Sequence, residues 1–361
     1  MKIVVIGTRG IPNILGGVET HCEELYPRIV AKGHDVIVIR RTPYVTSDNK
    51  LHEYKGIKLV DVKAPKKKSL EAIVHTFKAV LTAKKLKPDV LHVHAIGPAL
   101  MTPLARLLGM KVVMTNHGPD YDRKKWGKLA KFFLKTGERF GAKHANKIIV
   151  ISNVIKDILK KKYGRTDAVL IFNGVNKPVK SSEKDWLQKW GITKHYIFAM
   201  GRFVEEKGFH DLIDAFVKSN LADNYQLVLA GDADHPTPYS NRLKQLAQDN
   251  NVILTGFIKG EPLNQALTNA SLFVMPSYHE GLPIALLEAM SYDLDILVSD
   301  IPANQLPELK PDDFFRAGDV DSLLKGLIRK TSALQLERHY DLSRFDWDVI
   351  AKQTIEVYDN L

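Results

Sequence analysis

The sequence has a single cysteine, Cys22, among its 361 residues, which excludes an intramolecular disulfide. It also lacks a long uninterrupted apolar run. Its most apolar long stretch, 92–114, is interrupted by Pro98, Pro103, Arg106 and Gly109, whereas a bilayer-spanning helix needs about 20 apolar residues. No secretory signal pattern precedes the first apolar run, Ile3 to Ile6. These absences predict a cytoplasmic protein with no transmembrane helix.

The dinucleotide fingerprint GxGxxG is missing as well. The first glycine-containing loop, Gly7 to Gly17, is too long for that motif and has its glycines at other spacings. A nicotinamide-dependent dehydrogenase is therefore disfavoured. Gly16 and Gly17 stand side by side where a helix is expected to begin, and glycines there let the backbone approach a ligand closely.

Acidic residues are scarce in the first half of the chain. Residues 1–180 carry 35 Lys and Arg against 14 Asp and Glu, whereas residues 181–361 carry 17 against 27, so the halves have net charges of +21 and −10. A basic half attracts polyanions, which include nucleic acid, anionic lipid headgroups and phosphate-bearing substrates. The charge alone does not choose among them.

Short β-branched runs alternate with helical patterns in both halves, which is typical of parallel sheets covered by helices. Strands are predicted in the first half at 2–6, 35–39, 57–60, 90–93, 111–115, 147–151 and 168–172, and in the second at 195–200, 226–230, 251–255, 272–275 and 295–299. A polar stretch after Pro178 separates the two series. We expect an N-terminal domain of residues 1–178 and a C-terminal domain of residues 179–346. Parallel sheets bind ligands beyond the carboxyl ends of their strands, so two such domains predict one cleft between them.

The segment Glu280 to Glu288 follows a predicted strand, and Pro283 marks the expected start of a helix. The N-terminus of that helix offers backbone N–H groups to a diphosphate, which makes Gly281, Leu282 and Pro283 candidate donor-binding residues. Two carboxylates on such an element suit the hydroxyls of an elongated ligand. The alternative is a capped amphipathic helix with one surface glutamate, and the segment by itself leaves both interpretations open.

A second segment, Gly201 to Gly208, also follows a predicted strand and carries Arg202 and Lys207. These two cations can converge on a diphosphate and offset the charge that grows on it as it leaves. The alternative is an exposed charged loop.

His117 and Asp120 follow another predicted strand, where they can reach a sugar and an acceptor hydroxyl. His92 and His94 share one face of a strand. With no third ligand at convincing spacing, we interpret them as packing or cleft-lining residues and predict no metal site. Asp232 and Asp234 resemble a DxD metal motif, but they directly follow a strand and are interpreted as a loop.

With these segments in this order, the chain resembles the family 4 retaining glycosyltransferases of GT-B fold along essentially its whole length. Glu280 and Glu288 match the ExxxxxxxE pattern, Gly201, Arg202, Lys207 and Gly208 match GRxxxxKG, and Gly16 and Gly17 match the N-terminal double glycine. The resemblance implies an α/β fold of two Rossmann-like doubly wound domains facing across a cleft. It also implies that a terminal helix, residues 347–361, returns to the first domain.

The resemblance assigns roles to individual residues. Arg202 and Lys207 would hold the donor diphosphate, Glu288 the ribose and Glu280 the hydroxyls of the transferred sugar, with Gly17 and the amides near Leu282 and Pro283 completing the cradle. The base would lie near Phe257 and Ile258, His117 beside the donor sugar, and Arg9 and Asp120 on the acceptor side.

The implied reaction is a front-face substitution without a metal or other cofactor, in which an acceptor hydroxyl attacks from the side that the nucleotide leaves. A covalent role for Glu280 is the second choice. The opening residues Gly7 to Thr20 are most similar to a subgroup associated with rhamnose transfer in bacterial surface polysaccharide assembly. A hexose or deoxyhexose donor and a glycan or lipid-linked acceptor are expected.

A basic amphipathic pattern lies between Tyr121 and Lys143. Trp126, Leu129, Phe133 and Phe140 fall on one helical stripe with lysines around it, which suits an anionic membrane surface. We expect peripheral binding at the inner face of the cell membrane. The alternative is a helix that packs this stripe on its own core.

Three competing functions remain at this stage. A nucleotide-sugar epimerase or a phosphorylase of the same fold would use the same donor segments. A polyanion-binding or nucleic-acid-binding protein would explain the basic half, but no known nucleic-acid module is found and the paired glutamates would have no role. A noncatalytic nucleotide-sugar sensor fits every residue named. The sequence does not predict an oligomeric state.

Overall fold

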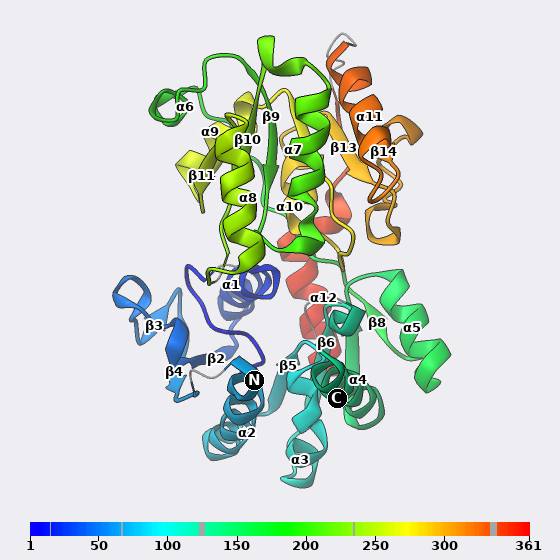
Figure 1. The fold of residues 1–361 in the computed structure, drawn as a ribbon. Coiled ribbons are helices and arrows are strands. Elements are labelled where there is room, and N and C mark those ends of the chain that lie inside the picture. Colours follow the sequence, from blue (N-terminus) through cyan, green and yellow to red (C-terminus); the bar gives the residue numbers. More distant parts are fainter. Residues whose placement is uncertain (15, 66–67, 123–126, 234, 333–337) are drawn as a thin grey trace. The chain divides into compact units, whose positions relative to one another are not determined.

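The computed structural model describes residues 1–14, 16–65, 68–122, 127–233, 235–332 and 338–361. The chain divides into two compact units (Figure 1). Unit 1 contains Met1–Gly174 and Arg344–Leu361, and unit 2 contains Val175–Ser343. The sequence had placed these boundaries a few residues later, at 178/179 and 346/347.

In its described residues, unit 1 contains an eight-stranded sheet in the order β3-β4-β2-β1-β5-β6-β7-β8. All neighbouring strands are parallel except β3, which is antiparallel to β4. Most of the strand residues are buried on both faces, which explains their continuous apolar runs. The strands are β1 (Lys2–Ile6), β2 (Asp35–Arg41), β3 (Glu53–Tyr54), β4 (Ile57–Val62), β5 (Val90–His94), β6 (Val112–Asn116), β7 (Lys147–Val150) and β8 (Val169–Leu170).

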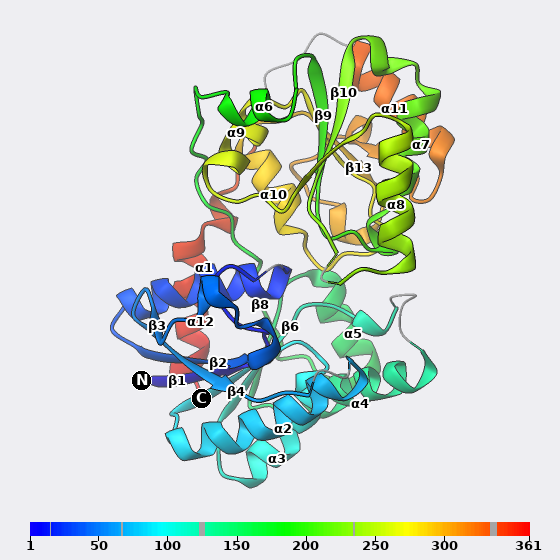
Figure 2. The same ribbon diagram turned by 60° about the vertical axis from the view of Figure 1, so that its left-hand side comes forward.

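Helices cover both faces of this sheet (Figure 2). The first helix and the last helix of the chain pack against each other on one face, and the helices between β4 and β8 lie on the other. They are α1 (Gly17–Ala31), α2 (Lys68–Leu86), α3 (Thr102–Leu107), α4 (Lys128–His144), α5 (Asn153–Tyr163) and α12 (Trp347–Asp359). Crossover connections between parallel strands are right-handed. The sheet grows in one direction from β1 to β4 and in the other from β5 to β8, so the helices after β4 lie on the opposite face from α1.

The terminal helix α12 is part of the unit 1 core. Trp347, Ile350 and Tyr358 are buried in the same apolar cluster as residues of α1 and β1. The Trp347 ring lies so close to Gly174 that a side chain at that position would collide with it. Asp346 caps the helix by accepting from the backbone N–H groups of Asp348 and Val349.

Unit 2 contains, in its described residues, a six-stranded parallel sheet in the order β11-β10-β9-β12-β13-β14. Its core combines apolar residues of β9, β10 and β12 with the inner faces of α7 and α11. The strands are β9 (His195–Met200), β10 (Tyr225–Ala230), β11 (Ile253–Gly256), β12 (Leu272–Met275), β13 (Ile296–Ser299) and β14 (Phe314–Phe315).

The helices of unit 2 also lie on both faces of its sheet (Figures 1 and 2). Helix α7 packs against α8 and α11, whereas α9 packs against α6. The helices are α6 (Asp185–Lys189), α7 (Phe209–Lys218), α8 (Pro238–Asp249), α9 (Glu261–Asn269), α10 (Ile284–Ser291) and α11 (Val320–Ser332). The doubly wound α/β arrangement predicted for each half is therefore confirmed.

None of the helices in the described ranges is long and apolar enough to cross a membrane.

Candidate functional site

The loop after β9 is shaped by two glycines. Gly201 has a φ of +155° and donates its N–H to the carbonyl of Ala230, at the end of the neighbouring strand. Gly208 has a φ of +66° and is the N-cap of α7. Both conformations are rarely adopted by other residues. Between them, the half-buried Arg202 and Lys207 lie at the carboxyl end of the sheet, as the sequence predicted.

The segment after β12 lies beside that loop. The Tyr278 N–H donates to the carbonyl of Glu206 at 2.9 Å, and the Tyr278 hydroxyl donates to Asp211 at 2.6 Å. A Cβ atom at Gly208 would collide with the carbonyl oxygen of Pro276. Because β9 and β12 are neighbours in the sheet, the loops that follow them are held together by backbone contacts.

This arrangement joins Lys207 and Glu280, which are 73 residues apart in the sequence. Lys207 Nζ lies 2.5 Å from Glu280 Oε1, and the two side chains are 17% and 12% exposed. A pair this far from solvent has a strong mutual attraction and strongly orients both groups. An anionic ligand at this point would meet a cation already fixed in place by a carboxylate.

Helix α10 begins one residue later than predicted. Pro283, expected as its first residue, is instead its N-cap, with an extended φ of −77° and ψ of 114°. Its carbonyl accepts from the Leu286 and Leu287 N–H groups. Leu282 is buried, Gly281 is half-buried, and the half-buried Glu288 lies inside the helix. The N–H groups at the N-terminus of the helix, which have no acceptor within it, therefore start at Ile284.

Phe257 and Ile258 directly follow β11, at the same edge of the sheet. Gly231, which follows β10, donates its N–H to the carbonyl of Gly256 at 2.8 Å. The Phe257 side chain is 51% exposed, and that of Ile258 is half-buried. All the site residues predicted for the second half thus belong to segments that follow the carboxyl ends of β9, β11 and β12 in unit 2.

In unit 1, the glycine loop after β1 is organised by two carboxylates that the sequence analysis did not identify. Glu19 accepts from the Arg9 N–H at 2.9 Å and from the Thr8 hydroxyl at 3.2 Å. Four residues later, Glu23 accepts from the Asn13 N–H at 3.1 Å. The i, i+4 spacing places both glutamates on one face of α1, and this spacing is the signal that could have revealed them.

Gly16 is the N-cap of α1, with a φ of +150°, and a side chain there would collide with the Glu19 carboxylate. Gly17 is the first helical residue and has open space around its Cα. The Arg9 guanidinium lies 5.2 Å from the centre of the Tyr44 ring. Among the described residues, no atom lies within 4 Å of a Cβ placed at Gly17, and the close approach of a ligand there stays a prediction.

His117 follows β6, and Asp120 begins a short 3-10 turn, Asp120–Asp122. His117 Nε2 lies 3.0 Å from His94 Nδ1, and His94 and His92 are fully buried with stacked rings. Burial lowers the pKa of His92 to about 3 and also lowers the pKa values of His94 and His117. These imidazoles are therefore neutral at pH 7.

His21, on α1, completes this histidine group. Burial lowers its pKa to about 4, and its Nδ1 lies 3.0 Å from the side-chain oxygen of Asn173. One nitrogen of each of His21, His94 and His117 lies within 4.8 Å of the others, as ligands to a metal ion would. The nitrogens of His94 and His117 already share a hydrogen bond with each other, however, so a metal would have to displace their proton.

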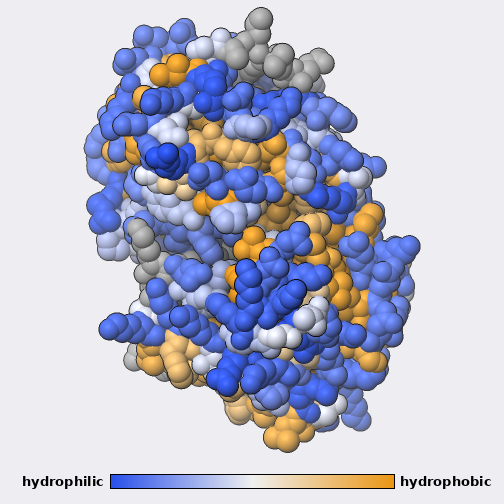
Figure 3. Space-filling view, turned by 90° about the vertical axis from the view of Figure 1, so that its right-hand side faces the viewer, coloured by the Kyte–Doolittle hydropathy of each residue, from blue (hydrophilic) through white to orange (hydrophobic). Residues whose placement is uncertain are grey.

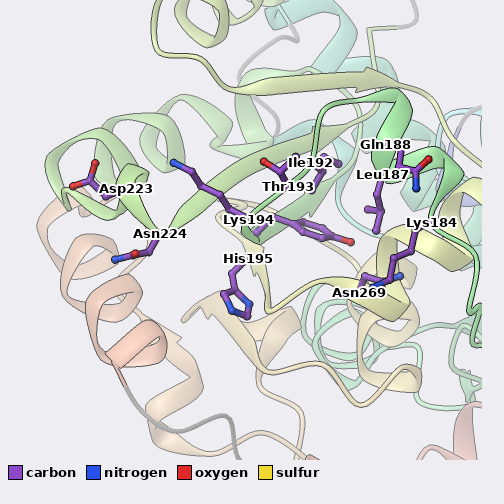
Figure 4. Close-up of a pocket in the computed structure, with 11 residues that line it drawn as sticks. Lys184, Leu187, Gln188, Ile192, Thr193, Lys194, His195, Asp223, Asn224 and Asn269 are labelled. Atoms are coloured by element: carbon purple, nitrogen blue, oxygen red, sulfur yellow. The ribbon is translucent and has the colours of Figure 1, made fainter.

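A cavity of about 570 Å³ lies elsewhere in unit 2. Figure 4 shows that polar side chains such as Lys184, Lys194 and His195 surround it. His195 is the first residue of β9, so the cavity lies at the amino ends of the strands, opposite the edge that carries Arg202 and Lys207. Parallel sheets bind ligands at the carboxyl edge, and we assign this cavity no role in the reaction.

Two predicted features fall partly outside the described residues. Lys124, Lys125 and Trp126, from the proposed amphipathic stripe, lie in the range 123–126, and Asp234 is also outside. Asp232 forms an ion pair with Lys244 at 2.8 Å, as expected for a surface loop.

Two family models match the chain. The model of Glycosyltransferase Family 4 matches residues 15–177, and that of Glycosyl transferases group 1 matches residues 182–308. The chain is 26% identical to an uncharacterized glycosyltransferase of Methanocaldococcus jannaschii, over 99% of this chain and 98% of that protein. It is 29% identical to the UDP-Gal:alpha-D-GlcNAc-diphosphoundecaprenol alpha-1,3-galactosyltransferase of Escherichia coli, over 73% of this chain and 71% of that one.

The fold comparison agrees. The structure matches that of Anabaena HepE in complex with UDP-glucose with a TM-score of 0.80, over 100% of both chains and at 18% identity. Both halves of the chain thus match glycosyltransferase models, and its architecture is the two-domain α/β fold of GT-B enzymes. The chain belongs to the family 4 glycosyltransferases. The epimerase and polyanion-binding alternatives receive no support from these relatives.

Proposed function

We propose that this glycosyltransferase transfers a hexose or deoxyhexose, with retention and without a metal, from a nucleoside diphosphate sugar to a glycan or lipid-linked acceptor of a surface polysaccharide. The observation that carries the proposal is the Lys207–Glu280 pair at the carboxyl edge of the unit 2 sheet. A galactosyltransferase relative named for a UDP-sugar donor and a diphosphoundecaprenol acceptor supports the substrate classes.

In the proposed reaction, the bond between the sugar C1 and the donor phosphate oxygen breaks while the acceptor oxygen bonds to C1 on the same face. The acceptor proton passes to the departing phosphate. Lys207 and Arg202 stabilise the negative charge that develops on the diphosphate. Glu280 orients Lys207 and accepts from sugar hydroxyls, and Glu288 accepts from the ribose hydroxyls.

Nucleotide binding tests the donor assignment. A nucleoside diphosphate at a hundredfold excess over its Kd should stabilise the folded protein by about 2.7 kcal/mol. We expect the resulting rise in Tm for one series of nucleotides and nucleotide sugars, and its loss in Glu288→Ala and Arg202→Ala. Arg316→Ala is the control, because the Arg316 side chain is 79% exposed in unit 2 and its ion pair is with Asp319, three residues later in the turn before α11.

Absence of a Tm rise in the unmodified protein with every nucleotide tested would refute a nucleotide-sugar donor. Release of nucleoside diphosphate should also require an acceptor. Acceptor-independent conversion of the donor would identify an epimerase instead.

The proposed acceptor lies at an anionic membrane, and α4 is the element that supports this. Leu129 and Phe133 of the stripe are 71% and 36% exposed, and Phe132 beside them is 63% exposed, so these side chains do not pack on the core. Lys128 and Lys135 flank it and are exposed. On the face of the molecule in Figure 3, hydrophilic residues dominate, with apolar patches between them. Basic residues near an anionic bilayer contribute about 1 kcal/mol each, and apolar side chains insert beside them.

Vesicle binding tests this surface. The protein should sediment with phosphatidylglycerol vesicles at low salt and not with phosphatidylcholine vesicles, because salt screens the lysine charges. Leu129→Ser with Phe132→Ser should weaken binding about tenfold or more, since each side chain contributes over 1 kcal/mol when buried. Val217→Ser, which removes a 46% exposed valine from α7, is the control. Equal sedimentation with both kinds of vesicle, or with none, would contradict a role for an anionic surface.

A further inference from the structure

His117 is the outer end of a chain of buried hydrogen bonds in unit 1. Its Nε2 lies 3.0 Å from His94 Nδ1, and His94 Nε2 lies 2.6 Å from the Tyr26 hydroxyl. Tyr26, on α1, is fully buried, as is His94. Because His94 occupies Nε2 of His117, Nδ1 is the His117 ring nitrogen left for a ligand.

The chain continues from Tyr26 to the terminal helix and back to the sheet. The Tyr26 and Tyr358 hydroxyls hydrogen-bond to each other, and the Tyr358 hydroxyl lies 2.5 Å from His92 Nδ1. A longer contact of 3.0 Å joins Tyr26 directly to the same nitrogen of His92. At the inner end, His92 Nε2 lies 2.7 Å from the Thr115 hydroxyl.

Each group in the chain has one proton to give. Burial lowers the pKa values of the histidines, so they stay neutral, and raises those of both tyrosines, so they keep their hydroxyl protons. Each pair of neighbouring atoms in the chain needs one proton between them to form a hydrogen bond. A pair with no proton would leave buried polar atoms without a hydrogen bond, at a cost of about 1–3 kcal/mol. A tyrosine that accepted from both neighbours would fill both contacts but leave its own buried hydroxyl proton without a partner. With every contact and every interior proton paired, the hydrogen bonds all point one way along the chain.

Only two arrangements satisfy this rule. If the bonds point toward His117, then His92, His94 and His117 all carry their proton on Nδ1. If they point toward Thr115, all three carry it on Nε2. A change at one histidine obliges the others to change, since the nitrogen that bears the proton is set by the partner of the other nitrogen.

We propose that Tyr26 is a positioning residue that couples the tautomers of His92, His94 and His117. The direction of the buried hydrogen bonds then sets whether His117 Nδ1 donates a hydrogen bond to the sugar or accepts one from it. This inference rests on the proposed role of His117 beside the donor sugar. Tyr26 is the link on which the coupling depends, because His94 Nε2 has its hydrogen bond with no other described residue. Removal of Tyr358 leaves the direct contact between Tyr26 and His92.

The coupling can be read without any substrate. Long-range ¹H–¹⁵N spectra of the ¹⁵N-histidine-labelled, full-length protein, with signals assigned by single His→Gln variants, report the tautomer of each ring. We expect the same tautomer for His92, His94 and His117. In Tyr26→Phe, His94 is expected to hold its proton on Nδ1 whatever the tautomer of His92, and Tyr358→Phe should keep the three rings alike. Different tautomers among the three rings of the unmodified protein would overturn the proposal.

Turnover supplies the second readout. Tyr26→Phe should lower kcat for sugar transfer about tenfold, as loss of an orienting hydrogen bond does elsewhere, while the Kd for nucleoside diphosphate stays within twofold. Tyr340→Phe is the matched control, because it removes a buried hydroxyl that donates only to the Leu294 carbonyl in unit 2. A folded Tyr26→Phe protein with unchanged kcat would overturn the positioning role. Absence of turnover in the unmodified protein would instead refute the proposed function, and the tautomer measurement would still decide the coupling.

Discussion

Replacement of Lys207 by methionine is expected to lower kcat for sugar transfer by about 10²–10³-fold, because a cation aimed at the leaving diphosphate is lost from a site with little solvent. Methionine keeps the unbranched side chain without its charge. The measurement is the steady-state rate of acceptor-dependent nucleotide release. A kcat within threefold of the unmodified value would contradict the role given to Lys207.

The control for this experiment is Lys244→Met. Lys244 also pairs with a carboxylate, Asp232, at 2.8 Å, but both side chains are about half exposed, at 46% and 45%. Exposed pairs contribute little, so kcat and Tm should stay unchanged. Lys207→Met also removes the cation that pairs with the largely buried Glu280 carboxylate, and is expected to destabilise unit 2. Glu280→Gln added to Lys207→Met should restore Tm but not kcat, which separates stability from catalysis.

Gly208→Ala is expected to destabilise unit 2 by about 3 kcal/mol, because it combines a left-handed backbone with a collision. The φ of Gly208 is +66°, and a Cβ atom there would meet the Pro276 carbonyl. The loops that carry Lys207 and Glu280 would have to separate, so kcat should fall as well. Urea unfolding and the transfer assay measure the two effects.

Gly164→Ala isolates the backbone contribution. Gly164 caps α5 with nearly the same φ, +67°, but its Cβ position is open, with no atom within 4 Å. That variant should lose only about 1 kcal/mol and keep its kcat. If Gly208→Ala behaved like Gly164→Ala, the close approach of the two loops would not matter for the site.

Strands buried on both faces were the most predictable part of the fold. The runs at 2–6, 195–200 and 272–275 were predicted with the bounds that β1, β9 and β12 have, because polar residues or turns bound each apolar run. The two-residue strands β3 and β14 were missed, and β8 is shorter than predicted. Two residues form no period, so such strands depend on their neighbours in the sheet rather than on local sequence.

The site was partly predictable for a similar reason. Residues that follow neighbouring parallel strands meet at one edge, so the proximity of the segments around Lys207 and Glu280 follows from the strand order. The roles assigned to these residues stay predictions. The coupling of Tyr26, His92 and Tyr358 was not predictable, because it joins the first helix, a central strand and the last helix. His92 and His94 had been interpreted as packing or cleft-lining residues; both are buried, and their hydrogen-bond partners are polar side chains.

The return of α12 to unit 1 has a consequence for biosynthesis. Unit 2 is one continuous stretch, Val175–Ser343, whereas unit 1 needs residues from both sides of it. Domains form as units while the chain is synthesised from its N-terminus. The apolar surface of α1 that Ile350 and Trp347 cover must therefore stay uncovered until the ribosome has synthesised unit 2. Unit 2 can thus complete its fold before unit 1, although the synthesis of unit 1 begins first.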